Sequence, residues 1–493
     1  MDFKTKKIRK HRKEHKPPQI FLEKKHNKKI TFALITTTII IALVATGIVK
    51  AVSSISLSFV LKAAGDELQA DTYGHTNFLL LGTGGENHEG GDLTDTIMIA
   101  SLDQETNQVS MISIPRDYYV KDDVLIDSRI NEVYLNAKTK FGSTSEGLEY
   151  AKNKIENIAG VPIHYWLKAD FKGFKELVDA IGGIDVNVEE AIYDPYYPKD
   201  ETFLYETFSI SPGPQHLDGA TALKYARSRK TTSDFSRAQR QQQIIYAIKE
   251  KALSSNIIFS KAKITNILDT LKANIETNIT IKEILTLGSL AKDIDRNSIS
   301  HFLIHDDPSQ CGGFVYTPLR QNYYGMFVLI EAGSKYNYIH KYFDLHLNTP
   351  YLNQDTTRIQ ILNGTKRGGA AAETKQVLKR FCLDITRFGN GRNKEVTETT
   401  YYYKKKYDED GEEIDSKPAI LEFLQKIIPG KESNQLPTEY EELGYWADAD
   451  LIIELGSDYT NSPNYLEDPY YYLPDAELYQ SPTTETTTTT NEN

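Results

Sequence analysis

Strands and helices alternate along residues 76–255 of this 493-residue chain, and this order limits its fold more than any other feature. Short apolar runs at 76–82, 95–103 and 108–120 are typical of buried strands. Residues 144–160 then predict a helix with an N-cap and a C-terminal glycine.

The same alternation continues beyond residue 160. Residues 162–170, 171–183 and 184–190 predict a strand, a helix and a strand, and two helices follow at 216–229 and 234–255. Because helices that alternate with strands cover a sheet, we expect an α/β domain with a central sheet. Ligands of such domains bind at strand ends.

Nineteen residues between two of the predicted helices, 225–243, read YARSRKTTSDFSRAQRQQQ. The polar side chains of interest are Arg227, Arg229, Asp234, Arg237 and Gln241. The last three share one helical face, and guanidinium groups match phosphate oxygens two at a time, so the stretch suits a pyrophosphate. The competing interpretation is a solvated helix with Asp234 as its N-cap.

Two further stretches hold candidate site residues. The loop from Gly82 to Asp95 is rich in glycine and acids, so its backbone can approach a ligand and Asp95 can hold a hard cation against phosphate. Alternatively, it is a flexible hairpin loop. Arg116 and Asp117 close an apolar strand and are either a structural ion pair or part of the same site.

The first fifty residues predict a membrane anchor. Residues 30–49 carry no charge and are long enough to cross a bilayer as a helix. Residues 1–29 hold twelve Lys/Arg and three Asp/Glu, so the positive-inside bias places them in the cytoplasm and the rest of the chain outside. A cleaved signal peptide is the alternative.

Charge and cysteine content add two limits. The net charge is -11 although residues 1–29 are strongly basic, so the body of the chain is acidic. The two cysteines, Cys311 and Cys382, cannot form a disulfide framework, but they could pair with each other outside the cytoplasm.

The motifs NFLLLG, LTDTIMIASLD, VSMISIPRDYYV, SRINEVY, VDAIGGIDVNV, HLDGATALKYARSR and DFSRAQRQQ, in this order, closely resemble the LytR-CpsA-Psr family over residues 76–332. The resemblance implies an α/β/α sandwich with an apolar tunnel for a polyprenyl chain. It also implies a membrane-anchored extracytoplasmic phosphotransferase. Such enzymes move a polyprenyl-pyrophosphate-linked glycopolymer, a teichoic acid or capsular polysaccharide, onto peptidoglycan.

The resemblance also assigns roles to residues of this chain. It implies that Asp95 binds Mg²⁺ (or Mn²⁺), that Arg116, Asp117, Arg227, Arg229, Asp234 and Arg237 are catalytic, and that Arg129, Asn131, Arg240 and Gln241 bind substrate. The chain departs from the family at Gly84 and Glu86, where an aspartate and an arginine are usual. We therefore expect Glu86 or Asp92 to supply the missing carboxylate, or the cation to bind more weakly.

The last third predicts a second, small α/β module that resembles the C-terminal domain often attached to this family. The expected divisions are an arm at 1–29, a transmembrane helix at 30–50, a linker at 51–75, the catalytic domain at 76–335, a polar linker at 336–356, the C-terminal domain at 357–459 and a disordered tail at 460–493.

Two alternatives to the transferase keep the same site. With water as acceptor the protein would be a polyprenyl-pyrophosphate phosphohydrolase, and without turnover it would be a lipid-carrier or cell-wall binding protein. No Ser-His-Asp or Cys-His arrangement is apparent. The basic arm is too short for a helix-turn-helix domain and suits anionic lipid, so we expect a membrane partner and no nucleic acid.

Overall fold

The computed structural model describes residues 67–473, apart from 87, 89, 199–203, 229–233, 256, 258–259, 334–336, 404–405, 408–412, 415–416, 464, 467, 469 and 471–472. For 234–236, 238, 406–407 and 413–414 it describes the backbone alone. The predicted cytoplasmic arm and transmembrane helix lie outside this part. None of the helices within it is long and apolar enough to span a bilayer.

A six-stranded mixed sheet forms the centre of the first domain, in the order β11-β6-β1-β2-β3-β12. Its strands are β1 (His75–Thr83), β2 (Thr94–Asp103), β3 (Val109–Ser113), β6 (Tyr165–Asp170), β11 (Ile275–Thr277) and β12 (Ile299–Leu303). The first three pair antiparallel in sequence order, whereas β6 and β12 lie parallel to β1 and β3. The predicted central sheet is therefore confirmed as a mixed one.

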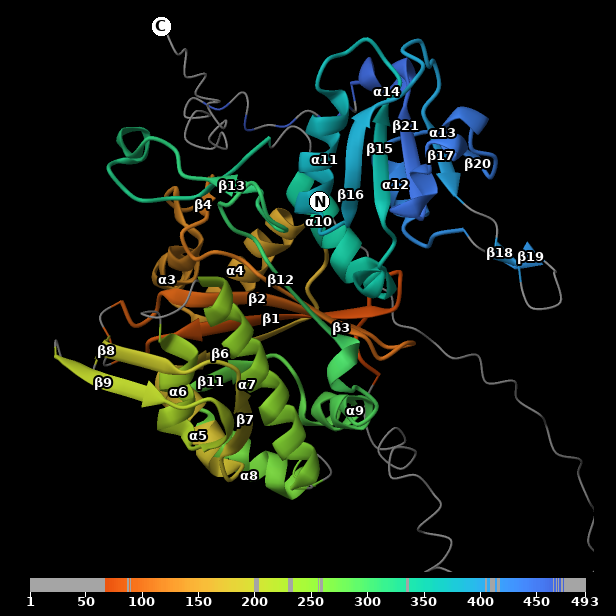
Figure 1. Ribbon diagram of the computed structural model, residues 1–493. Helices are drawn as coiled ribbons and strands as arrows, with labels where there is room; N and C mark the ends of the chain where they lie inside the picture. The colour runs from red at the N-terminus through yellow and green to blue at the C-terminus, as the bar shows by residue number, and fades with distance from the viewer. Residues whose placement is uncertain are drawn as a thin grey trace, which may run out of the picture.

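Helices cover both faces of this sheet (Figure 1). They are α3 (Ile130–Phe141) and α4 (Thr144–Ala159) on one face, and α5 (Phe171–Ala180), α6 (Gly219–Arg227), α7 (Asp234–Ser254), α8 (Lys261–Leu271) and α9 (Ile281–Ala291) on the other side. Because side chains alternate along a strand, Leu79 packs toward α3 and α4 while its neighbour Phe78 packs toward α9. The α/β/α arrangement follows.

Smaller elements complete the first domain. These are β4 (Tyr119–Val120) with β5 (Ser128–Arg129), β7 (Ile184–Val188) with β10 (Gly213–Leu217), β8 (Ile192–Pro198) with β9 (Tyr205–Ile210), β13 (Val315–Tyr316) with β14 (Ile330–Glu331), and the 3-10 turns Arg296–Ser298 and Arg320–Tyr323. The strand predicted over 108–120 is interrupted after Ser113, because Pro115 cannot donate to the sheet.

The second domain has a five-stranded sheet in the order β16-β15-β21-β17-β20. Its elements are β15 (Ile359–Asn363), α11 (Ala370–Arg380), β16 (Ile385–Asn390), β17 (Thr400–Tyr403), β18 (Lys406–Tyr407), β19 (Glu413–Ile414), α12 (Leu421–Ile427), β20 (Lys431–Ser433), α13 (Thr438–Glu442), the turn Tyr445–Ala447, β21 (Leu451–Leu455) and α14 (Ser457–Thr460). The predicted small α/β module is confirmed.

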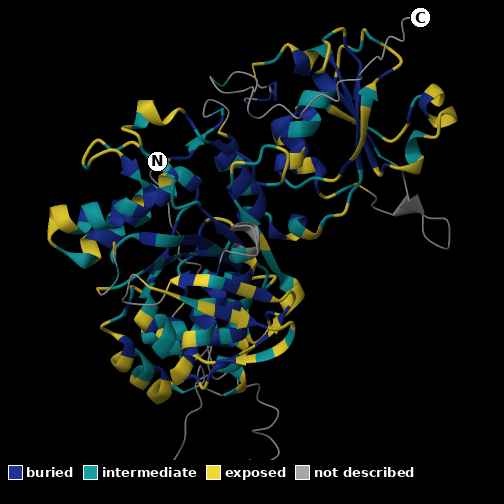
Figure 2. Cartoon of the chain, turned by 60° about the vertical axis from the view of Figure 1, so that its left-hand side comes forward, coloured by how far each residue is buried: buried dark blue, intermediate teal, exposed yellow. Residues whose placement is uncertain are grey.

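The segment predicted as a polar linker, 336–356, is largely helical and packed between the two domains. It forms α10 (Tyr338–Phe343), a π-helical turn (Asp344–Asn348) and a 3-10 turn (Pro350–Gln354). Tyr338 and Tyr342 are fully buried, and the same apolar core extends from the first sheet into the second domain (Figure 2). The prediction of a polar linker was wrong, because aromatic residues that are spaced along this polar sequence pack together in the core that the two domains share.

The tail begins later than the predicted residue 460. Tyr465, Leu466, Asp468 and Tyr470 are buried, and the Tyr470 hydroxyl lies 3.0 Å from the carbonyl oxygen of Gly313. Tyrosines made this segment appear polar in the sequence. In the fold their rings bury apolar area, and a hydroxyl is available for a hydrogen bond. Residues 474–493, where a disordered tail is expected, lie outside the described part.

A disulfide joins the two domains. Cys311 follows β12 and Cys382 follows α11, with their Cα atoms 4.6 Å apart and a sequence separation of 71 residues. The pairing that the sequence left open is therefore formed. It fixes the start of the second domain against the first beside the buried Tyr342.

Candidate functional site

Four charged residues form a chain of contacts at the ends of β2 and β3. Arg116 Nη1 donates to Asp95 Oδ1 at 3.0 Å, and Arg116 Nε lies 3.5 Å from Asp117 Oδ2. Arg129 Nη1 reaches the other oxygen of Asp117 at 3.5 Å. We call Asp95, Arg116, Asp117 and Arg129 the strand-end cluster. The sequence pattern predicted that Asp95 and the Arg116–Asp117 pair belong to one site, and the family resemblance added Arg129; the structure brings the four together.

Backbone pairing explains why these residues meet. Ile114 N donates to the Ile97 carbonyl, so the end of β3 lies beside the start of β2. The N-terminus of α3 closes the cluster, since Asn131 N donates to the Arg116 carbonyl and Ile130 N to the Tyr118 carbonyl. Arg129 is the N-cap of α3 and is held by Glu132, whose Oε1 accepts from Arg129 Nη2 at 2.6 Å.

The cluster is partly open to solvent and nearly balanced in charge. The side chains of Arg116 and Asp95 are 33% and 39% exposed, so a ligand can reach both. Burial acts to lower the pKa of the Arg116 guanidinium, but the carboxylates of Asp95 and Asp117 outweigh it and raise the pKa above its ordinary value. Arg116 therefore stays charged, as a phosphate contact requires.

Asp95 is the one predicted metal ligand that lies in the cluster. Asn131 Nδ2 is 3.4 Å from Asp95 Oδ1, while Asn131 Oδ1 is buried without a hydrogen-bond partner. Turning this amide over would place two oxygens side by side, and such turned amides are indistinguishable in shape. Mg²⁺ is commonly held by one or two protein oxygens together with substrate phosphates and water, so Asp95 and Asn131 fit such an ion.

The other two predicted carboxylates are directed elsewhere. Asp92 Oδ2 accepts from Lys138 Nζ at 2.8 Å, and this hydrogen bond raises the pKa of Lys138 despite its partial burial. Glu86 lines a pocket of about 470 Å³ together with Asp170. Within the described ranges no three His, Cys, Asp or Glu side chains are grouped closely enough to hold a metal. The structure thus does not join Glu86, Asp92 and Asp95 in one site.

The departure at Gly84 has a structural cause. A Cβ atom at Gly84 would lie 2.7 Å from Cγ and Nδ1 of His88, closer than real side chains approach. The His88 ring in turn packs edge-on against Phe171, with centroids 5.3 Å apart. An aspartate at residue 84 would have to displace His88. The side chain of His88, rather than a second carboxylate, therefore occupies the space beside Gly84.

Arg227 lies near the same loop, because it contacts the ring that His88 also contacts. Its Cζ lies 4.0 Å from the centroid of Phe171, the ring that also receives His88, and 5.5 Å from that of Tyr197. Stacking on a ring holds a guanidinium in place without neutralising its charge. Arg227 thus lies at the end of α6 beside the glycine-rich loop, as predicted.

Helix α7 approaches the start of β2 through Gln241, whose Nε2 lies 3.5 Å from Thr96 Oγ1. Arg237 precedes it by one turn on the same face. Arg240 points to α6 instead and donates to the carbonyls of Tyr225 and Ser228. Burial lowers its pKa. The structure therefore makes Arg240 an anchor of the arginine stretch, whereas Arg229 and the Asp234 side chain lie outside the described part.

A sequence model of the LytR_cpsA_psr family matches residues 50–327 of this chain, more than half of its length. The chain belongs to this family. Residues 356–459 match the domain described as LytR cell envelope-related transcriptional attenuator. The resemblance that the ordered motifs indicated is confirmed for both domains.

Two curated relatives are named as polyisoprenyl-teichoic acid–peptidoglycan teichoic acid transferases. TagV of Bacillus subtilis is 35% identical over 214 residues, which cover 42% of this chain and 51% of the relative. TagU of Bacillus anthracis is 29% identical over 224 residues, covering 45% and 66%. This chain thus spans between half and two thirds of these relatives. The crystal structure of B. subtilis TagV aligns with a TM-score of 0.43 and 26% identity, over 56% of this chain and 98% of that one.

Some site residues of this family member were not predicted. Glu132 pairs with Arg129, and Lys138 pairs with Asp92. Phe171 is the ring that both Arg227 and His88 contact. Glu132 follows the N-cap by three residues, which is capping-box spacing and could have located the start of α3. The hollows of about 520 Å³ beside α7 and about 470 Å³ beside α5 are lined mainly by polar side chains, and the apolar polyprenyl tunnel stays a prediction.

Proposed function

We propose that this LytR_cpsA_psr protein is a membrane-anchored, extracytoplasmic phosphotransferase. It moves a polyprenyl-pyrophosphate-linked anionic glycopolymer, such as a teichoic acid or capsule-like polysaccharide, onto peptidoglycan. The observation that carries the proposal is the strand-end cluster, beside which Gln241 of α7 reaches Thr96, while Arg227 stacks on Phe171 next to the glycine-rich loop. The activities for which the two relatives are named agree with it.

The chemistry requires charge neutralisation and positioning more than covalent help. The acceptor hydroxyl attacks the phosphorus that carries the glycan, and the bond from that phosphorus to the bridging oxygen breaks. Polyprenyl monophosphate leaves with the bridging oxygen and its electron pair, and the hydroxyl proton is lost to a base. Arg116 and Arg227 stabilise the phosphate charge that develops. Asp117 and Asp234 are the candidates for the base.

A divalent cation, Mg²⁺ or Mn²⁺, would add positive charge at the phosphate oxygens when bound. Asp95 would hold it, with Asn131 as the neighbouring oxygen donor. Because the space beside Gly84 is taken by His88, the site lacks the family's second carboxylate. We therefore expect the concentration of Mg²⁺ needed for half-maximal rate to be high.

The membrane parts of the proposal rest on the sequence. The uncharged run at 30–49 anchors the protein in the bilayer, and the basic arm before it keeps the N-terminus in the cytoplasm. The catalytic domain then lies on the side where peptidoglycan and lipid-linked polymers meet. A Cys311–Cys382 disulfide suits that compartment.

The test uses the full-length protein in detergent with a short-chain polyprenyl-pyrophosphate saccharide. Polyprenyl monophosphate release is measured with Mg²⁺ or EDTA, and with or without peptidoglycan fragments. We expect release that needs both the metal and the acceptor. Arg116→Ala should lower release by about 10²- to 10³-fold, whereas Arg392→Ala, which changes an exposed arginine of the second domain, should leave it unchanged.

Two other results would replace the proposal. Release that proceeds equally without peptidoglycan fragments would make the protein a phosphohydrolase. Tight binding of the carrier with no release under any condition would make it a carrier-binding protein, and the occupied space beside Gly84 would be the structural reason.

A further inference from the structure

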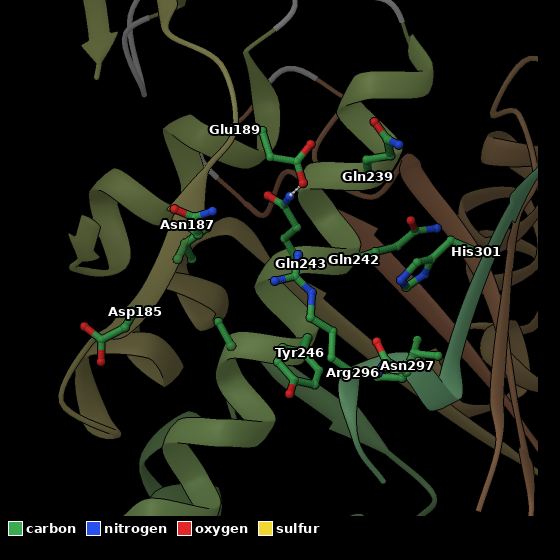
Figure 3. A pocket seen from close by; sticks show the side chains of 13 residues that line it. Asp185, Asn187, Glu189, Gln239, Gln242, Gln243, Tyr246, Arg296, Asn297 and His301 are labelled. Atoms are coloured by element: carbon green, nitrogen blue, oxygen red, sulfur yellow. Dashed lines mark hydrogen bonds between the residues drawn. The ribbon is translucent and has the colours of Figure 1, made fainter. Parts of the chain in front are cut away.

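A hollow of about 520 Å³ lies on the far side of α7 from Thr96, between β7, α7 and the segment that leads into β12. Figure 3 shows Asp185 and Asn187 on one side, Arg296, Asn297 and His301 on the other, and the glutamines of α7 between them. Gln239, Gln242 and Gln243 are spaced three and four residues apart, so they project from one helical face. None of them belongs to the strand-end cluster.

The amide side chains of this hollow are largely without partners. Gln242 is only 2% exposed, makes no hydrogen bond with the described residues, and borders the hollow. The side chains of Asn187, Gln239 and Asn297 also make none within the described part of the chain. A buried amide with unmet donors and acceptors costs free energy unless water or a ligand completes it. Gln242 therefore points to a polar ligand.

One side of the hollow, at Arg296, can receive an anionic group on that ligand. Arg296 is exposed and makes no hydrogen bond or ion pair with the described residues. The two acids of the wall keep their negative charge, and their oxygens already accept hydrogen bonds, Asp185 at 2.7 Å from His216 and Glu189 at 2.8 Å from Gln243. A free guanidinium is a ready partner for a phosphate or a carboxylate.

The lining selects a saccharide among polar ligands. An amide offers a donor and an acceptor side by side, which matches neighbouring sugar hydroxyls and acetamido groups. Tyr246 lines the hollow, but Lys249 Nζ lies 4.7 Å from its ring centroid, so one face of the ring is already occupied. A smaller hollow of about 90 Å³ shares Glu189, Gln239 and Gln243 and reaches Arg240, which holds the arginine stretch.

We propose that the hollow between β7, α7 and β12 binds a short oligosaccharide that carries an anionic group. The biological source of that saccharide rests on the proposed function. It is either the repeat unit of the transferred polymer, whose charge is a phosphate, or the peptidoglycan strand, whose muramic acid carries a carboxylate. In both cases the amides contact hydroxyl and acetamido groups, and Arg296 contacts the anion.

Binding to the full-length protein in detergent, measured by calorimetry without divalent cation, tests this site apart from transfer. The probes are a GlcNAc–MurNAc disaccharide, an N-acetylhexosamine disaccharide phosphate, and neutral chitobiose. Arg296→Gln should weaken binding of the charged probe by about tenfold and leave chitobiose unchanged, because only the anion contact is lost. Gln242→Leu should weaken every probe by roughly threefold to tenfold. Arg392→Gln is the matched control.

The outcomes separate this site from the proposed function. Tighter binding of the phosphate probe assigns the hollow to the donor polymer, and tighter binding of the muramic acid probe assigns it to the acceptor. No binding of any probe at millimolar concentration, or binding that neither variant changes, overturns the site and leaves the transferase untouched. Binding in a protein that shows no transfer keeps the site and removes the transferase.

Discussion

Two arginine–aspartate clusters among the described residues differ in what surrounds them. In the strand-end cluster, Arg116 and Asp95 are 33% and 39% exposed, and their contacts to neighbours range from 3.0 to 3.5 Å. At the junction of the domains, Arg380 and Asp468 are 2% and 7% exposed and meet through two hydrogen bonds of 3.0 and 2.9 Å. Arg380 Nε also donates to the Pro308 carbonyl.

Environment rather than residue type decides what each cluster does. A charge at the surface can exchange its partner for a ligand at little cost, because water and neighbouring groups compensate it. A buried guanidinium whose N–H groups donate to one carboxylate and one carbonyl is not available to bind a ligand. We therefore assign chemistry to the strand-end cluster and domain attachment to the Arg380–Asp468 pair.

Arg380→Met should produce the largest change in stability. It leaves Asp468 buried without its partner, which costs about 3–5 kcal/mol of unfolding free energy. Urea unfolding followed by tryptophan fluorescence measures the loss. The double variant Arg380→Met/Asp468→Leu should recover most of it, since an apolar pair of similar size replaces the buried charges. A single variant as stable as the parent would contradict the assignment.

Arg116→Ala should affect the reaction instead. Losing one preorganised charge that faces the reacting phosphate lowers transfer by about 10²- to 10³-fold. The unfolding free energy should change by less than about 1 kcal/mol, because the pair is partly exposed. Release of polyprenyl monophosphate and a urea titration of the same sample give the two numbers. A stability loss as large as that of Arg380→Met would show that the strand-end cluster, like the Arg380–Asp468 pair, stabilises the fold.

Removing the disulfide should weaken the junction without touching the chemistry. Cys311→Ala/Cys382→Ala frees a loop whose ends are 71 residues apart, at a cost of about 2–4 kcal/mol. Reduction of the parent protein should lower its urea midpoint in the same way and leave that of the double variant unchanged. Transfer at low urea should persist, and its loss would show that domain attachment shapes the site.

The smallest effect separates the carboxylates of the first loop. Asp92→Asn should leave the Mg²⁺ requirement of transfer within about twofold, because Asp92 is paired with Lys138 at the surface. Asp95→Asn should raise the half-maximal Mg²⁺ concentration by at least about tenfold, since a charged ligand is lost. The ratio of the two shifts tests whether one carboxylate holds the cation. Equal shifts would mean that Asp92 also binds the cation.

The sequence by itself determined the local elements and the family. Periodic apolar residues predicted β1, β2, α4 and α7 nearly to their ends, because period and capping are properties of neighbouring residues. The position of Arg116 and Asp117 shortly after β3 was also predicted from sequence, since a charged pair that follows an apolar strand lies at the edge of the sheet.

Tertiary structure alone decided which partner each side chain meets. The resemblance implied that Arg240 binds substrate, and the sequence left Asp92 as a possible cation ligand. In the structure Arg240 donates to a carbonyl of α6, and Asp92 accepts from Lys138 on α3. His88 fills the space at Gly84, and aromatic residues turn a predicted linker into the core between the domains. These outcomes depend on contacts between residues that are distant in sequence. Local sequence patterns do not distinguish among the possible partners of a side chain, whereas packing and burial in the folded chain do.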